Sequence, residues 1–150
     1  SKIMISKVLI AVDGSKHSLK CVSLGAQIAK NAGAKVLLLH VVKPYRLPES
    51  LKKFAQAEHM ATIDAELLRK GAQYLLASAL DEARKAGVNE VDMETEEGPI
   101  ARTIVDRAKS YKADLIVIGS RGMGGLEGML RGGVSHRVEI LAKCPVLVVK

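Results

Sequence analysis

The chain has 150 residues, of which 48% are hydrophobic, and its 23 Lys and Arg against 16 Asp and Glu give a net charge of +7. This length and apolar content predict one domain over residues 1–150, and no apolar stretch is long enough to span a membrane. The positive charge favours anionic partners. With only 3% aromatic residues and no basic tail, we expect a solvated lysine-rich surface rather than nucleic-acid binding.

The N-terminal residues and the cysteines predict a soluble, cytoplasmic protein. Lys7 leads directly into an apolar run that ends at Asp13-Gly14, which is not the pattern of a signal peptide. Cys21 and Cys144 are far apart in the sequence and form no CxxC pair. That arrangement is typical of a reduced chain.

In the first third of the chain, two apolar runs flank one helical pattern. Residues 8–12 predict a buried strand, and Ser15 can cap the helix that follows. Gly33 ends this helix, and residues 36–42 form a second apolar run. The two prolines in residues 43–48 indicate a connecting loop.

Residues 49–86 predict one long helix, with a break before Thr62 as the alternative, because leucine and alanine recur there at helical spacing. The remaining predicted elements are an exposed strand at 91–95, a helix opened by Pro99, a strand at 115–118, a helix at 134–143 and a strand at 146–149.

This alternation predicts a single-domain α/β fold with a doubly wound, mostly parallel sheet of five strands, Rossmann-like, with helices on both faces. Ligands of such sheets bind beyond the carboxyl ends of the strands, where the strand order reverses. Two polar segments follow predicted strands and reach that edge. They are Asp13-Gly14-Ser15 after the first strand and a glycine-rich segment that begins at Gly119.

The glycine-rich segment contains seven glycines between Gly119 and Gly133. Glycine lets backbone N–H groups approach an anion, and a helix N-terminus adds its dipole. A surface loop without a ligand is the alternative interpretation. The position between a strand and a helix favours phosphate binding. The P-loop pattern is absent, and no GxGxxG follows the first strand, which argues against a dinucleotide dehydrogenase.

The order of these motifs resembles the universal stress protein family, and within it the ATP-binding branch. The residues that carry the resemblance are Asp13-Gly14-Ser15, Leu39-His40-Val41, the spacing Gly-x2-Gly-x9-Gly from Gly119, and Cys144-Pro145 before the last strand. The resemblance covers essentially the whole chain. It implies a fold like that of the adenine nucleotide alpha hydrolases, with a nucleotide pocket between the first and fourth strands.

The resemblance also implies roles for individual residues. Ala11 and Val41 would border the adenine, the backbone of Val41 would read the base edge, and Asp13 would lie near the ribose and phosphates. The residues that would wrap the ribose and phosphates are Gly119, Gly122, Gly132, Gly133, Val134 and Ser135.

Two of the candidate site residues also have an interpretation that requires no bound ligand. Asp13 can cap the turn that follows its strand, as aspartate often does. Arg121 lies inside the glycine-rich segment and either contacts phosphate or faces solvent.

One position departs from the family pattern. The family motif continues from its last glycine with serine or threonine, whose hydroxyl helps to hold the terminal phosphates, and this chain has Gly133 there. Ser135 lies two residues further on and is a candidate substitute. A lost hydrogen bond to a charged group costs about 1.5–3 kcal/mol, enough to change the preference between ATP and AMP.

The remaining polar candidates carry no recognisable chemistry. The four histidines lack metal-ligand spacing; we expect His40 to pack in the structure and His17 to face solvent. Cys21 and Cys144 lack a nucleophile signature, and no catalytic residues are predicted.

The leading hypothesis is a regulatory or stress-response protein that binds ATP, ADP or AMP, with any Mg²⁺ carried by the phosphates. The resemblance implies a homodimer formed through the strand Val146–Val149, with an unknown protein partner downstream. The alternatives are a slow ATP hydrolase and an interaction module that has lost nucleotide binding.

Overall fold

The computed structural model describes residues 4–43, 48–57, 60–120 and 133–150, without the side chains of residues 52, 55–57 and 60–65. The elements in chain order are β1 (Lys7–Ala11), α1 (Lys16–Ala32), β2 (Lys35–Val42), α2 (Glu49–Ala57), α3 (Met60–Lys85), β3 (Val91–Glu97), α4 (Ile100–Tyr111), β4 (Leu115–Gly119), α6 (Gly133–Leu141) and β5 (Val146–Val149).

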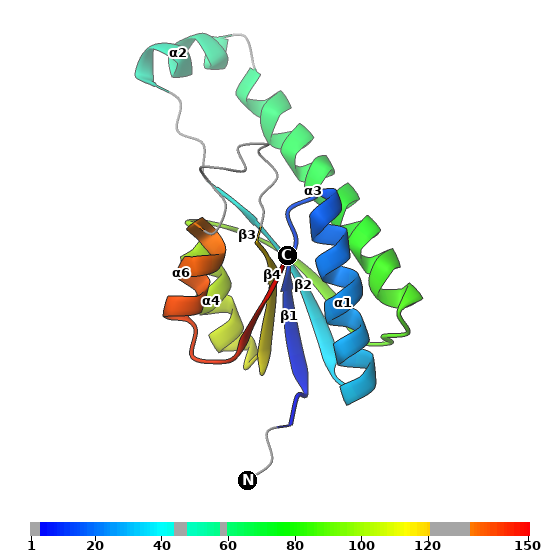
Figure 1. Ribbon diagram of the computed structural model, residues 1–150. Coiled ribbons are helices and arrows are strands. Elements are labelled where there is room, and N and C mark those ends of the chain that lie inside the picture. The colour runs from blue at the N-terminus through cyan, green and yellow to red at the C-terminus, as the bar shows by residue number, and fades with distance from the viewer. Residues whose placement is uncertain (1–3, 44–47, 58–59, 121–132) are drawn as a thin grey trace.

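The five strands form one sheet in the order β3-β2-β1-β4-β5, and every neighbouring pair is parallel. Helices α1 and α3 cover one face of the sheet, and α4 and α6 cover the other (Figure 1). The predicted doubly wound α/β fold is therefore confirmed, and the sheet is wholly parallel.

Alternate residues of the central strands fill two separate cores. Ile10, Leu38 and Val117 pack under α1 and α3, whereas the neighbouring Leu9 and Leu37 pack under α4 and α6. All five side chains are fully buried. This explains why the central strands have continuous apolar runs, because both faces of each strand are covered by helices.

Local signals in the sequence set the ends of α1. The hydroxyl of Ser15 accepts a hydrogen bond from the N–H of Ser18 (3.0 Å), as expected of an N-cap. At the other end Gly33 adopts the left-handed conformation with φ of 71°, which a side chain would disfavour.

The predicted long helix is in fact two helices. α2 ends at Ala57 and α3 begins at Met60, so the interruption lies closer to the N-terminus than the predicted break before Thr62. α3 is long enough to extend past the sheet, and Figure 1 shows its N-terminal half and α2 beyond the carboxyl ends of the strands. The helix after Pro99 begins one residue later, at Ile100, and Pro99 is its N-cap.

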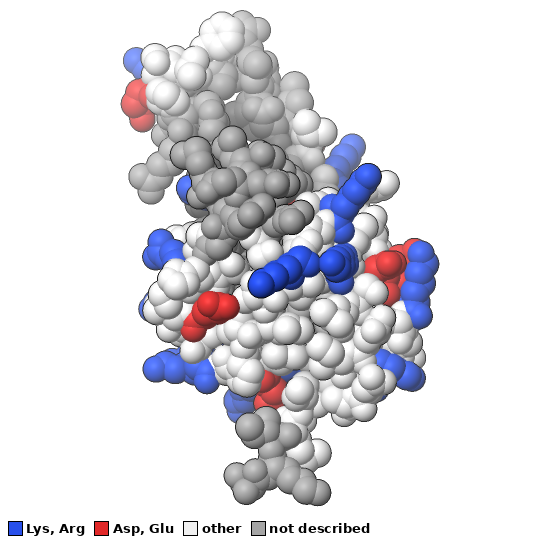
Figure 2. Space-filling model, viewed as in Figure 1, with Lys and Arg blue, Asp and Glu red and all other residues white. Residues whose placement is uncertain are grey.

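Charged side chains of both signs are spread over the face that Figure 2 draws. Figure 2 shows Lys and Arg side chains over several parts of the visible face, with a few Asp and Glu among them. No helix among the described residues is both long and apolar enough to cross a membrane.

An ion pair attaches the edge strand β3 to α4. Nε and Nη2 of Arg107 donate to the two carboxylate oxygens of Glu94 at 2.5 and 2.6 Å. These hydrogen bonds lower the pKa of the Glu94 carboxyl below its usual range. Because the folded-state pKa is the lower one, the pair stabilises the fold above the unfolded-state pKa. That contribution is lost as pH falls through the folded-state pKa.

We predict that Glu94→Gln lowers the free energy of unfolding by about 1 kcal/mol at pH 7, because it removes a two-point ion pair. The difference from wild type should shrink as pH is lowered through the carboxylate range. Urea unfolding at a series of pH values measures it. Asp106→Asn, which removes a solvent-exposed ion pair with Arg102 (3.5 Å), is the control and should change little. A difference that does not depend on pH would contradict the prediction.

Candidate functional site

The strand order reverses between β1 and β4, which are neighbours in the sheet. After β1 the chain enters α1 on one face, whereas the helix that follows β4 in the described chain, α6, lies on the opposite face (Figure 1). Such a switch point leaves a crevice beyond the carboxyl ends of the two strands. Asp13-Gly14-Ser15 follows β1 at this edge and Gly119 ends β4, whereas residues 121–132 of the glycine-rich segment lie outside the described residues.

The turn after β1 is held by hydrogen bonds among its own residues. Oδ1 of Asp13 accepts from the N–H of Ser15 (2.9 Å) and from its hydroxyl (2.7 Å). The hydroxyl of Ser18 accepts from the N–H of Asp13 (3.1 Å). Gly14, with φ of 87°, supplies the backbone conformation that the turn requires. The turn-capping role of Asp13 is therefore present, and Oδ2 stays outside these hydrogen bonds.

The backbone of Val41 is directed toward the crevice. Along β2 the odd-numbered residues face β1, as the bonds from Lys35 N to Ser6 O (3.0 Å) and from Val12 N to Leu39 O (2.8 Å) show. Val41 is the next odd-numbered residue, and β1 has ended at its level. Within the described residues no backbone hydrogen bond joins Val41 to β1, so its N–H and C=O face the space beyond that strand.

Gly119 approaches the same space from the other side. Ile116 and Ser120 donate their N–H groups to β5, at Pro145 O (3.0 Å) and Val149 O (2.9 Å). Backbone groups alternate along a strand, so those of Gly119 are directed toward β1.

The side of Gly119 that faces α1 leaves no room for a side chain. A Cβ there would lie 2.8 Å from Cδ2 of His17 and 3.1 Å from Sγ of Cys21. The glycine is therefore required by helix packing, a reason that the sequence did not reveal.

Helix α6 presents its N-terminus at the crevice, because it leads back from the carboxyl end of the sheet to the start of β5. Its first residues are Gly133, which is exposed, Val134, which is half-buried, and Ser135, which is only 6% exposed. The first N–H groups of a helix lack partners within the helix and attract anions. Around the Cβ position of Gly133, none of the described residues lies within 4 Å.

Three of the predicted site residues, the adenine-bordering Ala11 and Val41 and the ribose-phosphate contact Val134, lie on the same side of the sheet. Ala11, Val41 and Val134 are half-buried and pack against the same core under α4 and α6. That core includes Ile118, the last apolar residue of β4 before Gly119. The structure thus brings an apolar wall to the crevice. Arg121, Gly122 and Gly132 lie outside the described residues.

Two histidines help to hold the crevice together. The prediction that His17 faces solvent was wrong: it is half-buried, and its Nε2 is 2.8 Å from the carbonyl oxygen of Val149. His40 packs in the structure as expected, with Nδ1 2.8 Å from Val12 O. The role of His17 could not be found from sequence spacing because its partner is 132 residues away.

The thiols are poor nucleophiles at neutral pH. Burial raises the pKa of Cys21 to about 11, and the negative charge of Asp13 adds to the effect. Burial also raises the pKa of Cys144, which packs against the core under α4 and α6. Among the described residues no group of three or more His, Cys, Asp or Glu side chains could hold a metal ion.

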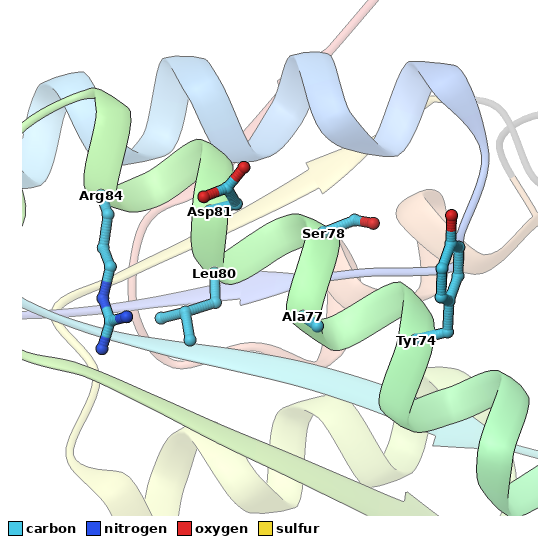
Figure 3. A pocket seen from close by; sticks show the side chains of 6 residues that line it. All are labelled: Tyr74, Ala77, Ser78, Leu80, Asp81 and Arg84. Atoms are coloured by element: carbon cyan, nitrogen blue, oxygen red, sulfur yellow. The ribbon is translucent and has the colours of Figure 1, made fainter.

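A separate hollow lies on α3 and contains none of the predicted site residues. It has a volume of about 300 Å³ and is lined by Tyr74, Ala77, Ser78, Leu80, Asp81 and Arg84. Figure 3 shows that all six come from this one helix. Tyr74 is 78% exposed, so this hollow does not enclose a ligand as a crevice between elements would.

The fold is that of an α/β protein with a candidate ligand site at the switch point of its parallel sheet. Comparison with known proteins makes this more specific. The model of the universal stress protein family matches residues 4–150. Universal stress protein YxiE of Bacillus subtilis is 33% identical over 150 residues, covering 98% of this chain and 100% of that protein. Universal stress protein MJ0531 of Methanocaldococcus jannaschii is 39% identical, covering 98% of this chain and 83% of that protein.

A solved structure of a universal stress protein in complex with cAMP is also similar. It is 28% identical to this chain, covers 98% of each chain and superposes with a TM-score of 0.70. The chain belongs to the universal stress protein family, as the motifs indicated.

We predict that Gly119→Ala destabilises the protein by about 1–3 kcal/mol, because the added methyl group forces His17 and Cys21 away from β4. Thermal unfolding measures the change. Gly71→Ala is the matched control. Gly71 lies in α3 with no described atom within 4 Å of a Cβ, so that substitution should be neutral or stabilising. Equal melting temperatures for Gly119→Ala and wild type would contradict the assigned packing.

Proposed function

We propose that this protein binds an adenine nucleotide at the crevice between β1 and β4 and acts as a regulatory or stress-response protein. The observation that carries the proposal is the convergence of two backbone features at this edge of the sheet. The N–H and C=O of Val41 face the crevice from β2, and the N-terminus of α6 faces it from the other side of β1.

Each feature suits one part of the nucleotide. A backbone N–H beside a C=O matches the acceptor and donor on the edge of adenine, and half-buried Ala11, Val41 and Val134 offer an apolar wall to a purine. The helix N-terminus suits phosphate. cAMP contains both an adenine and a phosphate group. The family member solved in complex with cAMP therefore supports an adenine nucleotide as the ligand class.

The nucleotide proposed is ATP, ADP or AMP, with any Mg²⁺ bound through the phosphates rather than by a protein cluster. Oδ2 of Asp13 is the carboxylate oxygen left for the ribose or for such a cation. A regulatory role requires that two conformations, or two sets of partners, differ in nucleotide affinity. Unequal binding of ATP and AMP would supply that difference.

The test is to purify the protein without added nucleotide, denature it, and identify any released nucleotide by chromatography. The emptied protein is then titrated with ATP, AMP and cAMP by calorimetry. We expect at least one of the three to bind. We also expect Gly133→Ser to raise the affinity for ATP over AMP about tenfold, because the new hydroxyl donates to a charged phosphate.

Gly133→Ala is the matched control, since it fills the same space without a donor and should leave the ATP to AMP ratio unchanged. A protein that releases no nucleotide and gives no heat with any of the three would overturn the proposal. The interaction module would then be the better reading.

We propose further that the protein is a homodimer that pairs through β5. This strand lies at the edge of the sheet and has a neighbour strand on one side only. The N–H groups of Ile116 and Ser120 donate to Pro145 O and Val149 O. The backbone groups of the odd-numbered residues along β5 therefore face β4. The N–H and C=O of Val146 and Val148 are therefore directed outward, and an apolar edge with free backbone groups favours pairing with another strand.

We predict that Val148→Pro converts the dimer to a monomer, because it removes an outward N–H without removing a bond to β4. Val148→Ala, which keeps that N–H, should remain dimeric. Sedimentation velocity over a range of protein concentrations distinguishes the two. A wild-type protein that is monomeric throughout, or a Val148→Pro variant that is as dimeric as Val148→Ala, would refute pairing through this edge.

A further inference from the structure

The carbonyl oxygen of Val149 joins three elements at the functional end of the sheet. It accepts a hydrogen bond from the N–H of Ser120, the residue after β4, at 2.9 Å. Nε2 of His17, in the first turn of α1, lies 2.8 Å from the same oxygen. One acceptor at the end of the edge strand therefore serves both β4 and α1.

The His17 ring is fixed from a second direction. It lies against Gly119, where an added Cβ would be 2.8 Å from Cδ2 and 3.1 Å from Nε2 of the ring. Gly119 and Val149 are also register partners in the β4–β5 pair. The His17 ring thus packs against Gly119 of β4 and forms a hydrogen bond with Val149 of β5.

Helix α1 makes a second contact with the end of the chain. Nζ of Lys20, one turn after His17, donates to the carbonyl oxygen of Lys150 at 3.0 Å. The same helix begins at the Asp13-Gly14-Ser15 turn, which faces the crevice. Helix α1 therefore connects the crevice wall to the edge strand through two successive carbonyl groups.

We propose that His17 is a positioning residue for the nucleotide site: it holds Val149 and, through the shared carbonyl, Ser120 at the start of the glycine-rich segment. This inference rests on the proposed function.

The experiment compares wild type with His17→Leu, which removes the donor and keeps most of the volume, and His17→Gln, which restores a donor. If leucine does not pack beside Gly119, the His17→Ala variant is used in place of His17→Leu. Lys16→Ala, an exposed neighbour in the same turn, is the control. Amide hydrogen exchange of Ser120 and of the core residue Leu38 is measured in the nucleotide-free protein. Calorimetry with ATP and with cAMP gives the affinities.

We expect His17→Leu to speed exchange at Ser120 roughly fivefold relative to Leu38 and to weaken nucleotide binding by about the same factor, as loss of one hydrogen bond implies. His17→Gln and Lys16→Ala should stay near wild type. Unchanged exchange at Ser120, or equal acceleration at Ser120 and Leu38, would overturn the inference, because a purely structural role moves both amides together. Nucleotide affinity that survives in His17→Leu would overturn it as well.

The two proposals fail in different ways. A wild-type protein that binds none of ATP, AMP and cAMP refutes the proposed nucleotide function. Selective loss of protection at Ser120 in that same protein would still establish that His17 positions this residue.

Discussion

The parallel pairing of β1 with β4 is the constraint on which the functional end of this protein depends. Parallel neighbours bring their carboxyl ends to one edge, and the described helices α1 and α6 lie on opposite faces, which is the arrangement of a switch point. The fully buried side chains of Leu9, Ile10, Ile116 and Val117 hold this pair in place from both faces. The site is thus a consequence of the same burial that stabilises the sheet.

Backbone groups, more than side chains, define the crevice. Val41 and Gly119 direct N–H and C=O groups beyond the end of β1, and the first N–H groups of α6 have no partner within that helix. The carboxylate of Asp13, by contrast, is largely engaged in its own turn. A site built in this way recognises shape and hydrogen-bond pattern, and it depends on precise strand and helix placement.

That placement relies on close contacts around Gly119. His17 and Cys21 occupy the space that a Cβ of Gly119 would need, while the Val149 carbonyl is shared between α1 and the residue that follows β4. Desolvation of Cys21 at this contact raises its thiol pKa to about 11, so the thiol serves packing. Elements α1, β4 and β5 meet at this junction.

The sequence by itself determined the order of strands and helices, the α/β class, the helix ends at Ser15 and Gly33, and the two polar segments after β1 and β4. These follow from local periodicity, capping and glycine preferences, which act over a few residues. Only the tertiary structure decided that His17 bonds to Val149, that the space beside Gly119 is filled by α1, and that the Val41 backbone is directed beyond the end of β1. Each of these depends on which strands become neighbours, a property of residues more than 100 positions apart in the case of His17 and Val149.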